Sequence, residues 1–125
     1  MSFEPPDSHV SLELLGRACA VGSSLACASL VLCLAWFNPY VSNDPGLNVP
    51  MGLLLALAVL AAAAGVGRQA GLLIIAFALS FVPMGLYLLG TPGIFAGIGV
   101  AHLGYLLAAA LIMLSRQRGR IFRGR

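Results

Sequence analysis

The sequence predicts an all-α integral membrane protein, a four-transmembrane-helix bundle built from two helical hairpins. The first observation is composition: of 125 residues, 60% are hydrophobic and 9% are charged, whereas soluble domains carry about 25% charged residues. A soluble domain of this size lacks the interior volume to bury so much apolar surface. The second observation is a set of four long charge-free stretches, and the third is the turn chemistry between them.

The four charge-free stretches define the membrane spans. They run over 18–37, 50–67, 70–89 and 94–114, and each is close to the roughly 20 residues that a helix needs to cross the hydrocarbon core. With their flanking signals, the helices are expected at about 11–38, 49–67, 70–89 and 92–115 of a single membrane domain. A polar lead at 1–10 and a basic tail at 116–125 complete the chain.

Residues with turn and capping preferences separate the stretches. Asp44-Pro45-Gly46 has the residue order of a type I or II turn, after which Pro50 fits the first turn of a helix. The segment 65–69 predicts a short polar hinge around Arg68. Gly90-Thr91-Pro92 supplies in order a C-terminal glycine, an N-cap and a proline at the first helical position.

The seven arginines favour one orientation. Short cytoplasmic loops retain basic residues, so the arginine-rich tail places the C-terminus in the cytoplasm, and four crossings return the N-terminus to the same side. Arg68 then also lies inside, in a bacterial-type inner membrane or a plasma membrane. The tail is expected to lie against anionic lipid headgroups and not to bind nucleic acid; its arginines are Arg116, Arg118, Arg120, Arg123 and Arg125.

The polar residues of the first helix have structural explanations. Glu13 precedes Arg17 by four residues, a spacing that predicts an ion pair along the helix. Cys19, Cys27 and Cys33 are too far apart along the helix axis to form disulfides with one another. We expect them to be small packing residues with weak S–H donors, and we expect no metal site.

Small residues at four-residue spacing mark helix-packing faces, because association in lipid depends on close backbone approach. The most persuasive small-residue stripe lies in the fourth helix, and its members are Gly93, Gly97, Ala101, Gly104 and Ala108. The first two helices each offer two alternative faces. In the first helix, one face is formed by Gly22 and Ala26, and the other by Ala20, Ser24 and Ala28. In the second helix, one face is formed by Ala61 and Gly65, and the other by Ala63 and Gly67.

Pro83 is the first of two candidate functional residues. It lies inside the third helix, where it removes a backbone donor and collides with the carbonyl of Leu79. A kink is therefore expected. A static kink that improves packing is favoured over a gating hinge.

His102 is the second candidate, because ionisable groups near mid-membrane are functional candidates by default. Its ring is expected to lie over Gly99, where the missing side chain leaves a notch. We favour a neutral structural histidine over a proton-linked or ligand-binding one. The expected partner is a backbone carbonyl near the Pro83 kink or a hydroxyl from Ser23, Ser24 or Ser80.

The sequence offers no catalytic constellation. Between Arg17 and Arg116 the only carboxylate is Asp44 in a loop, and no nucleophile, base and orienting group can be assembled from spacing. We expect a non-enzymatic protein without cofactor or metal. It would act through helix–helix contacts, as an accessory subunit of a larger membrane complex or as a homo-oligomer. The alternative is a small oligomeric channel, holin-like pore or transporter.

Overall fold

The computed structural model describes residues 8–37 and 45–123, and these are helical almost throughout. In chain order the elements are α1 (Ser8–Phe37), α2 (Pro45–Val66), α3 (Ala70–Ser80), the π-helical turn η1 (Phe81–Gly85), α4 (Leu86–Leu89) and α5 (Ile94–Arg123). The segments long and apolar enough to span a membrane are Val10–Phe37, Asn48–Val66, Ala70–Leu89 and Ile94–Ile121. The predicted four-helix membrane bundle is confirmed.

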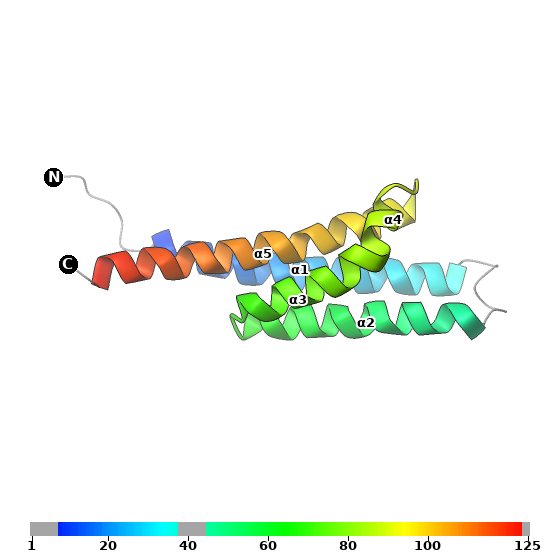
Figure 1. Cartoon of the computed structure of the whole chain (residues 1–125), viewed down its shortest axis with the longest axis horizontal. Helices are drawn as coiled ribbons and strands as arrows, with labels where there is room; N and C mark the ends of the chain where they lie inside the picture. The colour runs from blue at the N-terminus through cyan, green and yellow to red at the C-terminus, as the bar shows by residue number, and fades with distance from the viewer. Residues whose placement is uncertain (1–7, 38–44, 124–125) are drawn as a thin grey trace.

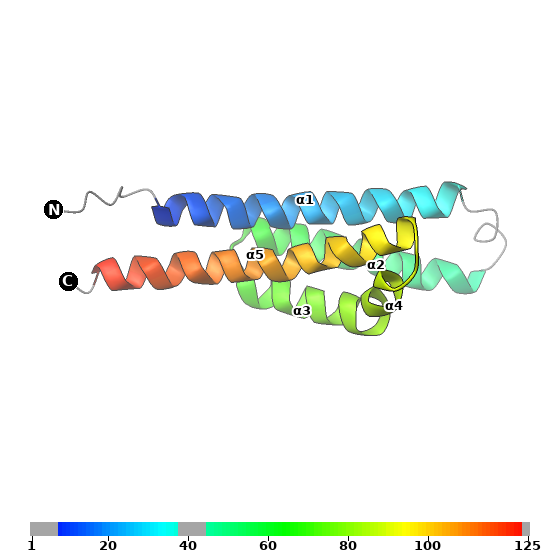
Figure 2. The ribbon, with the colours of Figure 1, turned by 90° about the horizontal axis from the view of Figure 1, so that it is seen from above.

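The four spans run alternately in opposite directions (Figure 1). α1 packs most extensively on α5 and also on α2, and α3 packs on both α2 and α5. The spans therefore close into a ring of two hairpins, α1 with α2 and α3 with α5. The start of α1 and the end of α5 lie at the same end of the bundle (Figures 1 and 2).

α1 and α5 are longer than a bilayer requires. Each has 30 residues, about 45 Å at 1.5 Å per residue, against about 30 Å for the hydrocarbon core. Both project past the α2–α3 turn at the end that holds Arg68 and Arg116, here called the basic end (Figure 2). The sequence predicts that the last helix ends near residue 115, but it continues to Arg123. Arginine and glutamine are good helix formers, so the helix continues beyond the end of its apolar segment.

The connection from α1 to α2 differs from the prediction in the roles of its prolines. α2 begins at Pro45, and a proline at the first helical position loses only an N–H that has no intrahelical partner. Pro50 consequently lies inside the helix, beyond the first turn where the sequence placed it. Three predicted features, Asp44, Arg125 and residues 1–7 of the polar lead, lie outside the described residues.

The α2–α3 turn is closed by a Schellman motif. Gln69 N donates to Ala64 O at 2.8 Å and Arg68 N donates to Gly65 O at 3.2 Å, the two hydrogen bonds that define this motif. The motif needs a left-handed residue, usually glycine, and here Arg68 supplies it with a φ of 58°. Such a conformation costs a non-glycine residue about 1 kcal/mol, so the side chain of Arg68 is expected to have a compensating role.

That role is a tie between three elements at the basic end. Arg68 Nε lies 3.1 Å from Glu13 Oε1 of α1, and the Arg68 carbonyl accepts a hydrogen bond from Arg116 Nη2 of α5. The predicted partner of Glu13, Arg17, is therefore wrong. A contact between segments far apart in the sequence replaces the pair along the helix, because the turn brings Arg68 beside α1.

The α4–α5 turn also assigns its residues differently from the prediction. Thr91 N donates to Leu88 O at 3.1 Å and Thr91 Oγ1 donates to Tyr87 O at 2.9 Å, so Thr91 caps the end of α4 and does not begin α5. Gly90 has a right-handed φ of −79°, whereas Gly93 has a φ of 85°. Gly93 therefore makes the reversal that the sequence assigned to the preceding residues.

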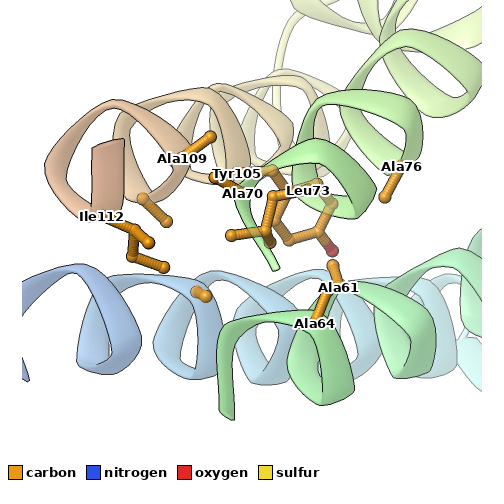
Figure 3. Close-up of a cluster of buried hydrophobic side chains, with 10 residues drawn as sticks. Ala61, Ala64, Ala70, Leu73, Ala76, Tyr105, Ala109 and Ile112 are labelled. Atoms are coloured by element: carbon orange, nitrogen blue, oxygen red, sulfur yellow. The ribbon is translucent and has the colours of Figure 1, made fainter. Parts of the chain in front are cut away.

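Buried side chains form two clusters along the bundle. The cluster nearer the basic end is rich in alanine (Figure 3), and its members are Ala20, Ala61, Ala64, Ala70, Leu73, Ala76, Tyr105, Ala108, Ala109 and Ile112. The other contains Cys27, Val31, Leu54, Ala58, Ile98 and Ala101. Alanine allows close helix approach, which supplies dispersion contacts where lipid gives little hydrophobic drive.

Candidate functional site

The candidate site is a buried contact between Cys27 of α1 and His102 of α5. Cys27 Sγ lies 3.4 Å from His102 Nε2, and their exposed fractions are 0% and 1%. Either the thiol donates to Nε2 or a protonated Nε2 donates to sulfur, depending on the histidine tautomer. The predicted partners of His102, the serine hydroxyls and a backbone carbonyl, are wrong. The helix crossing places a thiol at that depth instead.

The second ring nitrogen of His102 has no hydrogen-bond partner among the described residues. It faces η1, where a Cβ on Gly85 would lie 2.9 Å from His102 Nδ1. The sequence predicts that the His102 ring lies over a notch at Gly99. The backbone of Gly85 and Leu89 fills that notch instead. A Cβ there would lie 2.9 Å from Leu89 N and 3.0 Å from Gly85 O. The His102 imidazole therefore lies between the Cys27 thiol and the backbone of η1 at Gly85, which has no side chain.

Tyr105 lies one turn further along α5 and belongs to the same site. Its ring centroid is 5.7 Å from that of His102, and its side chain is fully buried. The hydroxyl points toward Ala61 of α2 (Figure 3) and has no hydrogen-bond partner among the described residues. Ser24, the neighbouring hydroxyl on α1, instead donates to Ala20 O at 2.8 Å. Two unpartnered polar atoms thus lie beside the Cys27–His102 contact.

Pro83 lies in the middle of η1, the π-helical turn of the third span. Leu86 N donates to Phe81 O across this turn, a wider spacing than in an α-helix. The extra residue relieves the clash between the proline ring and the preceding turn. η1 also carries Gly85, so the Pro83 distortion and the His102 ring meet at one point.

The small-residue stripe of α5 is divided between several neighbours. Ala101 and Ala108 are buried, Gly97 faces the Leu30 side chain, and a Cβ on Gly104 would overlap the Ser23 hydroxyl. Gly93 does not belong to the stripe, because it precedes the helix and takes the left-handed conformation required by the turn. Of the remaining four positions, Gly97 and Gly104 lie against side chains of α1, and Ala101 and Ala108 belong to the two buried clusters.

The cysteines of α1 have three different environments. Cys19 Sγ donates to Gly104 O at 3.5 Å, Cys27 contacts His102, and Cys33 is exposed. Within the part of the chain that the structure describes, no group of three or more His, Cys, Asp or Glu side chains is arranged to hold a metal ion. The sequence analysis expected Cys27 to be a packing residue and missed its contact with His102, because position along a helix fixes depth in the membrane but not the rotation of the helix.

Arginines at the basic end lie along the projecting part of α5. Arg116, Arg118 and Arg120 are exposed, and Arg116 also reaches the α2–α3 turn. Their spacing places them on different sides of the helix. This end of the molecule therefore presents positive charge around α5 where the helix emerges from the bundle.

The fold and the site define a small helical membrane protein with a buried thiol–imidazole contact. Comparison of the chain with protein-family models, curated proteins and solved structures found no match.

Proposed function

We propose that the protein is a non-catalytic multi-pass membrane protein that acts through helix–helix contacts, as one subunit of a small homo-oligomer. The observation that carries this proposal is a groove between α1 and α5 on the lipid-facing side of the bundle. Its lining is almost entirely apolar and rich in small residues: Cys19, Gly22, Ser23, Ala26, Gly97, Val100, Ala101, Leu103, Gly104 and Leu107. Small residues of this kind let the backbone of another helix approach closely.

A second copy of the chain is the partner that we propose for this surface, because the surface offers both a ridge and a groove. Val100, Leu103 and Leu107 are exposed and form a ridge along α5, while Gly22 and Ala26 form the adjoining floor on α1. Copies with the same membrane orientation are related by a two-fold axis along the bilayer normal. Such an axis places the ridge of each copy in the groove of the other, as in other isologous contacts.

Gly22 allows this contact to be tested without disturbing the fold. A Cβ at Gly22 would have nothing within 4 Å, and the same is true of Gly71 on α3, away from the groove. We therefore expect Gly22→Leu to fill the groove and leave the chain monomeric in liposomes, while Gly71→Leu behaves as wild type. Single-molecule photobleaching of labelled protein at low density counts the copies. A monomeric wild type, or an oligomer that persists in Gly22→Leu, would refute the groove as the contact.

The proposal includes an orientation with both termini in the cytoplasm. The support for it is that Arg68, Arg116, Arg118 and Arg120 gather at the basic end, where they would meet anionic headgroups. Reporters fused after Arg125 or inserted at Arg68 should report cytoplasm, and one inserted near Asp44 should report the outside. An external signal from the C-terminal fusion would reverse the orientation.

An oligomeric pore or transporter is the second candidate. It is favoured by the polar side chains Ser24, Cys27, His102 and Tyr105, which are buried close together within the membrane span. Solute or ion leakage from liposomes that contain the purified protein would support the pore and contradict a purely contact-based role. A bilayer that stays tight at protein densities where oligomers form would exclude it.

A further inference from the structure

The exposed side of α5 repeats every seven residues. From Val100 to Ser115 the exposed side chains follow one another in steps of three, three and one residues, and every residue between them is buried or half-buried. The core positions of this heptad, here called the α5 seam, are Val100, Leu103, Leu107, Ala110 and Leu114. Leu106 and Met113 are also exposed and lie beside the seam. An apolar seven-residue repeat is the pattern by which one helix packs along another.

The repeat continues past the rest of the bundle. Its next core positions are Gln117 and Ile121, both exposed, and they follow Arg116, whose side chain reaches the α2–α3 turn. They therefore lie on the part of α5 that projects at the basic end (Figure 2). Ile121 is 64% exposed on a segment rich in arginine, where headgroups and water replace hydrocarbon. Burial against another helix would remove this side chain from water.

Gln117 indicates which helix packs along the seam. It is the one polar residue among the heptad core positions from Val100 to Ile121, and an amide buried in a contact needs a hydrogen-bond partner. A two-fold axis along the bilayer normal places each residue beside its own counterpart. In a pair of identical chains the Gln117 amide therefore meets a second amide, which can both donate and accept. A single polar residue in such a seam also fixes the register of the two helices.

Arginines flank the seam where it leaves the bundle. Arg118 and Arg120 are exposed on either side of the line from Gln117 to Ile121. Two copies bring their guanidinium groups toward one another, and this repulsion opposes pairing. Anionic headgroups offset such repulsion because they gather around basic segments at the membrane surface. The projecting part of the contact should therefore depend on the charge of the membrane.

We propose that α5 packs against α5 of a second copy along the heptad from Val100 to Ile121, and that anionic headgroups hold its arginine-flanked end together. The contact is about 32 Å long at 1.5 Å per residue. A helix of 3.6 residues per turn drifts against a seven-residue repeat, so the two helices wind around each other with a left-handed supercoil. The inference rests on the proposed oligomer, because the seam contains the ridge that borders the groove. It adds which helices meet, in which register, and the class of lipid that controls the contact.

Oxidative cross-linking of the full-length chain in vesicles that contain phosphatidylglycerol tests the register. Cys19→Ala and Cys33→Ala remove the accessible thiols, and Cys27 stays because its side chain is fully buried. In this background Gln117→Cys and Ile121→Cys, each made singly, should give a disulfide-linked dimer when copper phenanthroline is added.

Gly119→Cys is the matched control. Gly119 lies between Gln117 and Ile121 but off the seam, and a Cβ there meets nothing within 4 Å. It should give about tenfold less dimer, because thiols on the outer sides of two paired helices lie beyond the reach of a disulfide. In vesicles of phosphatidylcholine alone, the yield from Ile121→Cys should fall about fivefold.

The outcomes separate the seam from the proposed oligomer. Equal yields from Gln117→Cys, Gly119→Cys and Ile121→Cys would overturn the seam. So would the absence of dimer from Gln117→Cys when photobleaching counts two or more copies of the wild type, a result that leaves the oligomer standing with another contact. A monomeric wild type would contradict both. A yield from Ile121→Cys that is the same in both lipids would contradict the role of the headgroups.

Discussion

Two faces of α5 both depend on glycine, for different reasons. Toward η1 and α4, Gly99 lies against backbone: Leu89 N, Leu89 Cα and Gly85 O are within 3.0 Å of where its Cβ would be. Toward α1, Gly104 lies against a side chain, the hydroxymethyl group of Ser23. Helical backbone is held by its own hydrogen bonds, whereas a serine side chain can rotate or be replaced. Two glycines that look equivalent in the sequence therefore differ in how well they tolerate a larger side chain.

The largest effect is expected at the backbone contact. Gly99→Ala should destabilise the bundle by about 3 kcal/mol, the upper part of the range for overpacked sites, because neither helix can move without breaking hydrogen bonds. Thermal unfolding in detergent measures the change. The matched control is Gly119→Ala in the same helix, where a Cβ meets nothing within 4 Å. If both variants unfold at the same temperature, the backbone crossing is not as close as described.

A smaller effect is expected at the side-chain contact. Gly104→Ala should cost about 1 to 2 kcal/mol, because the new methyl group displaces Ser23. Ser23→Gly in the same chain should recover part of that loss, and a double-mutant cycle measures the coupling. No such rescue is available at Gly99, where the neighbours are backbone atoms. Additive effects of the two changes would show that Ser23 is not the obstacle.

The Cys27–His102 contact should contribute less than either glycine. His102→Leu should cost about 1 kcal/mol, as one lost hydrogen bond within a membrane does. His102→Gln should keep the fold, since the amide can still bond the thiol. Thermal unfolding in detergent gives these values. A loss from His102→Leu that is just as large in a Cys27→Ala background would indicate that the two residues do not interact.

The smallest effect is expected at Gly97, although it belongs to the same stripe as Gly104. A Cβ there would lie 3.1 Å from Leu30 Cδ1, the far end of a flexible side chain. Gly97→Ala should therefore change the stability by less than about 0.5 kcal/mol, within the scatter of surface substitutions. A loss as large as that of Gly104→Ala in the same unfolding assay would show that Leu30 is fixed in place.

The class of fold and the number of spans could be predicted from the sequence alone. Charge-free stretches of the right length have few physical outcomes, because lipid requires every backbone polar group to be paired within the segment. The distortion at Pro83 followed for a similar reason, since a proline in the middle of a helix removes one backbone hydrogen bond and collides with the preceding turn. Such features depend on a residue and its near neighbours in the chain.

Which face of each helix is buried could not be predicted from the sequence and depends on how the helices pack. Ala61 and Gly65 are buried while Ala63 and Gly67 are exposed, and Gly22 and Ala26 are also exposed. In a helix that is apolar all round, the hydrophobic pattern does not distinguish these faces. Close packing between the spans therefore determines which face of each helix is buried.

The partners of His102 and Glu13 were decided in the same way. Cys27 and Arg68 lie far from them in the sequence, and a contact at that separation depends on how α1, α5 and the α2–α3 turn rotate against one another. Spacing along the chain fixes depth in the membrane at 1.5 Å per residue. Spacing does not fix the rotation of each helix, which determines whether two side chains at the same depth face each other. For that reason the sequence identified His102 as a candidate but not Cys27 as its partner.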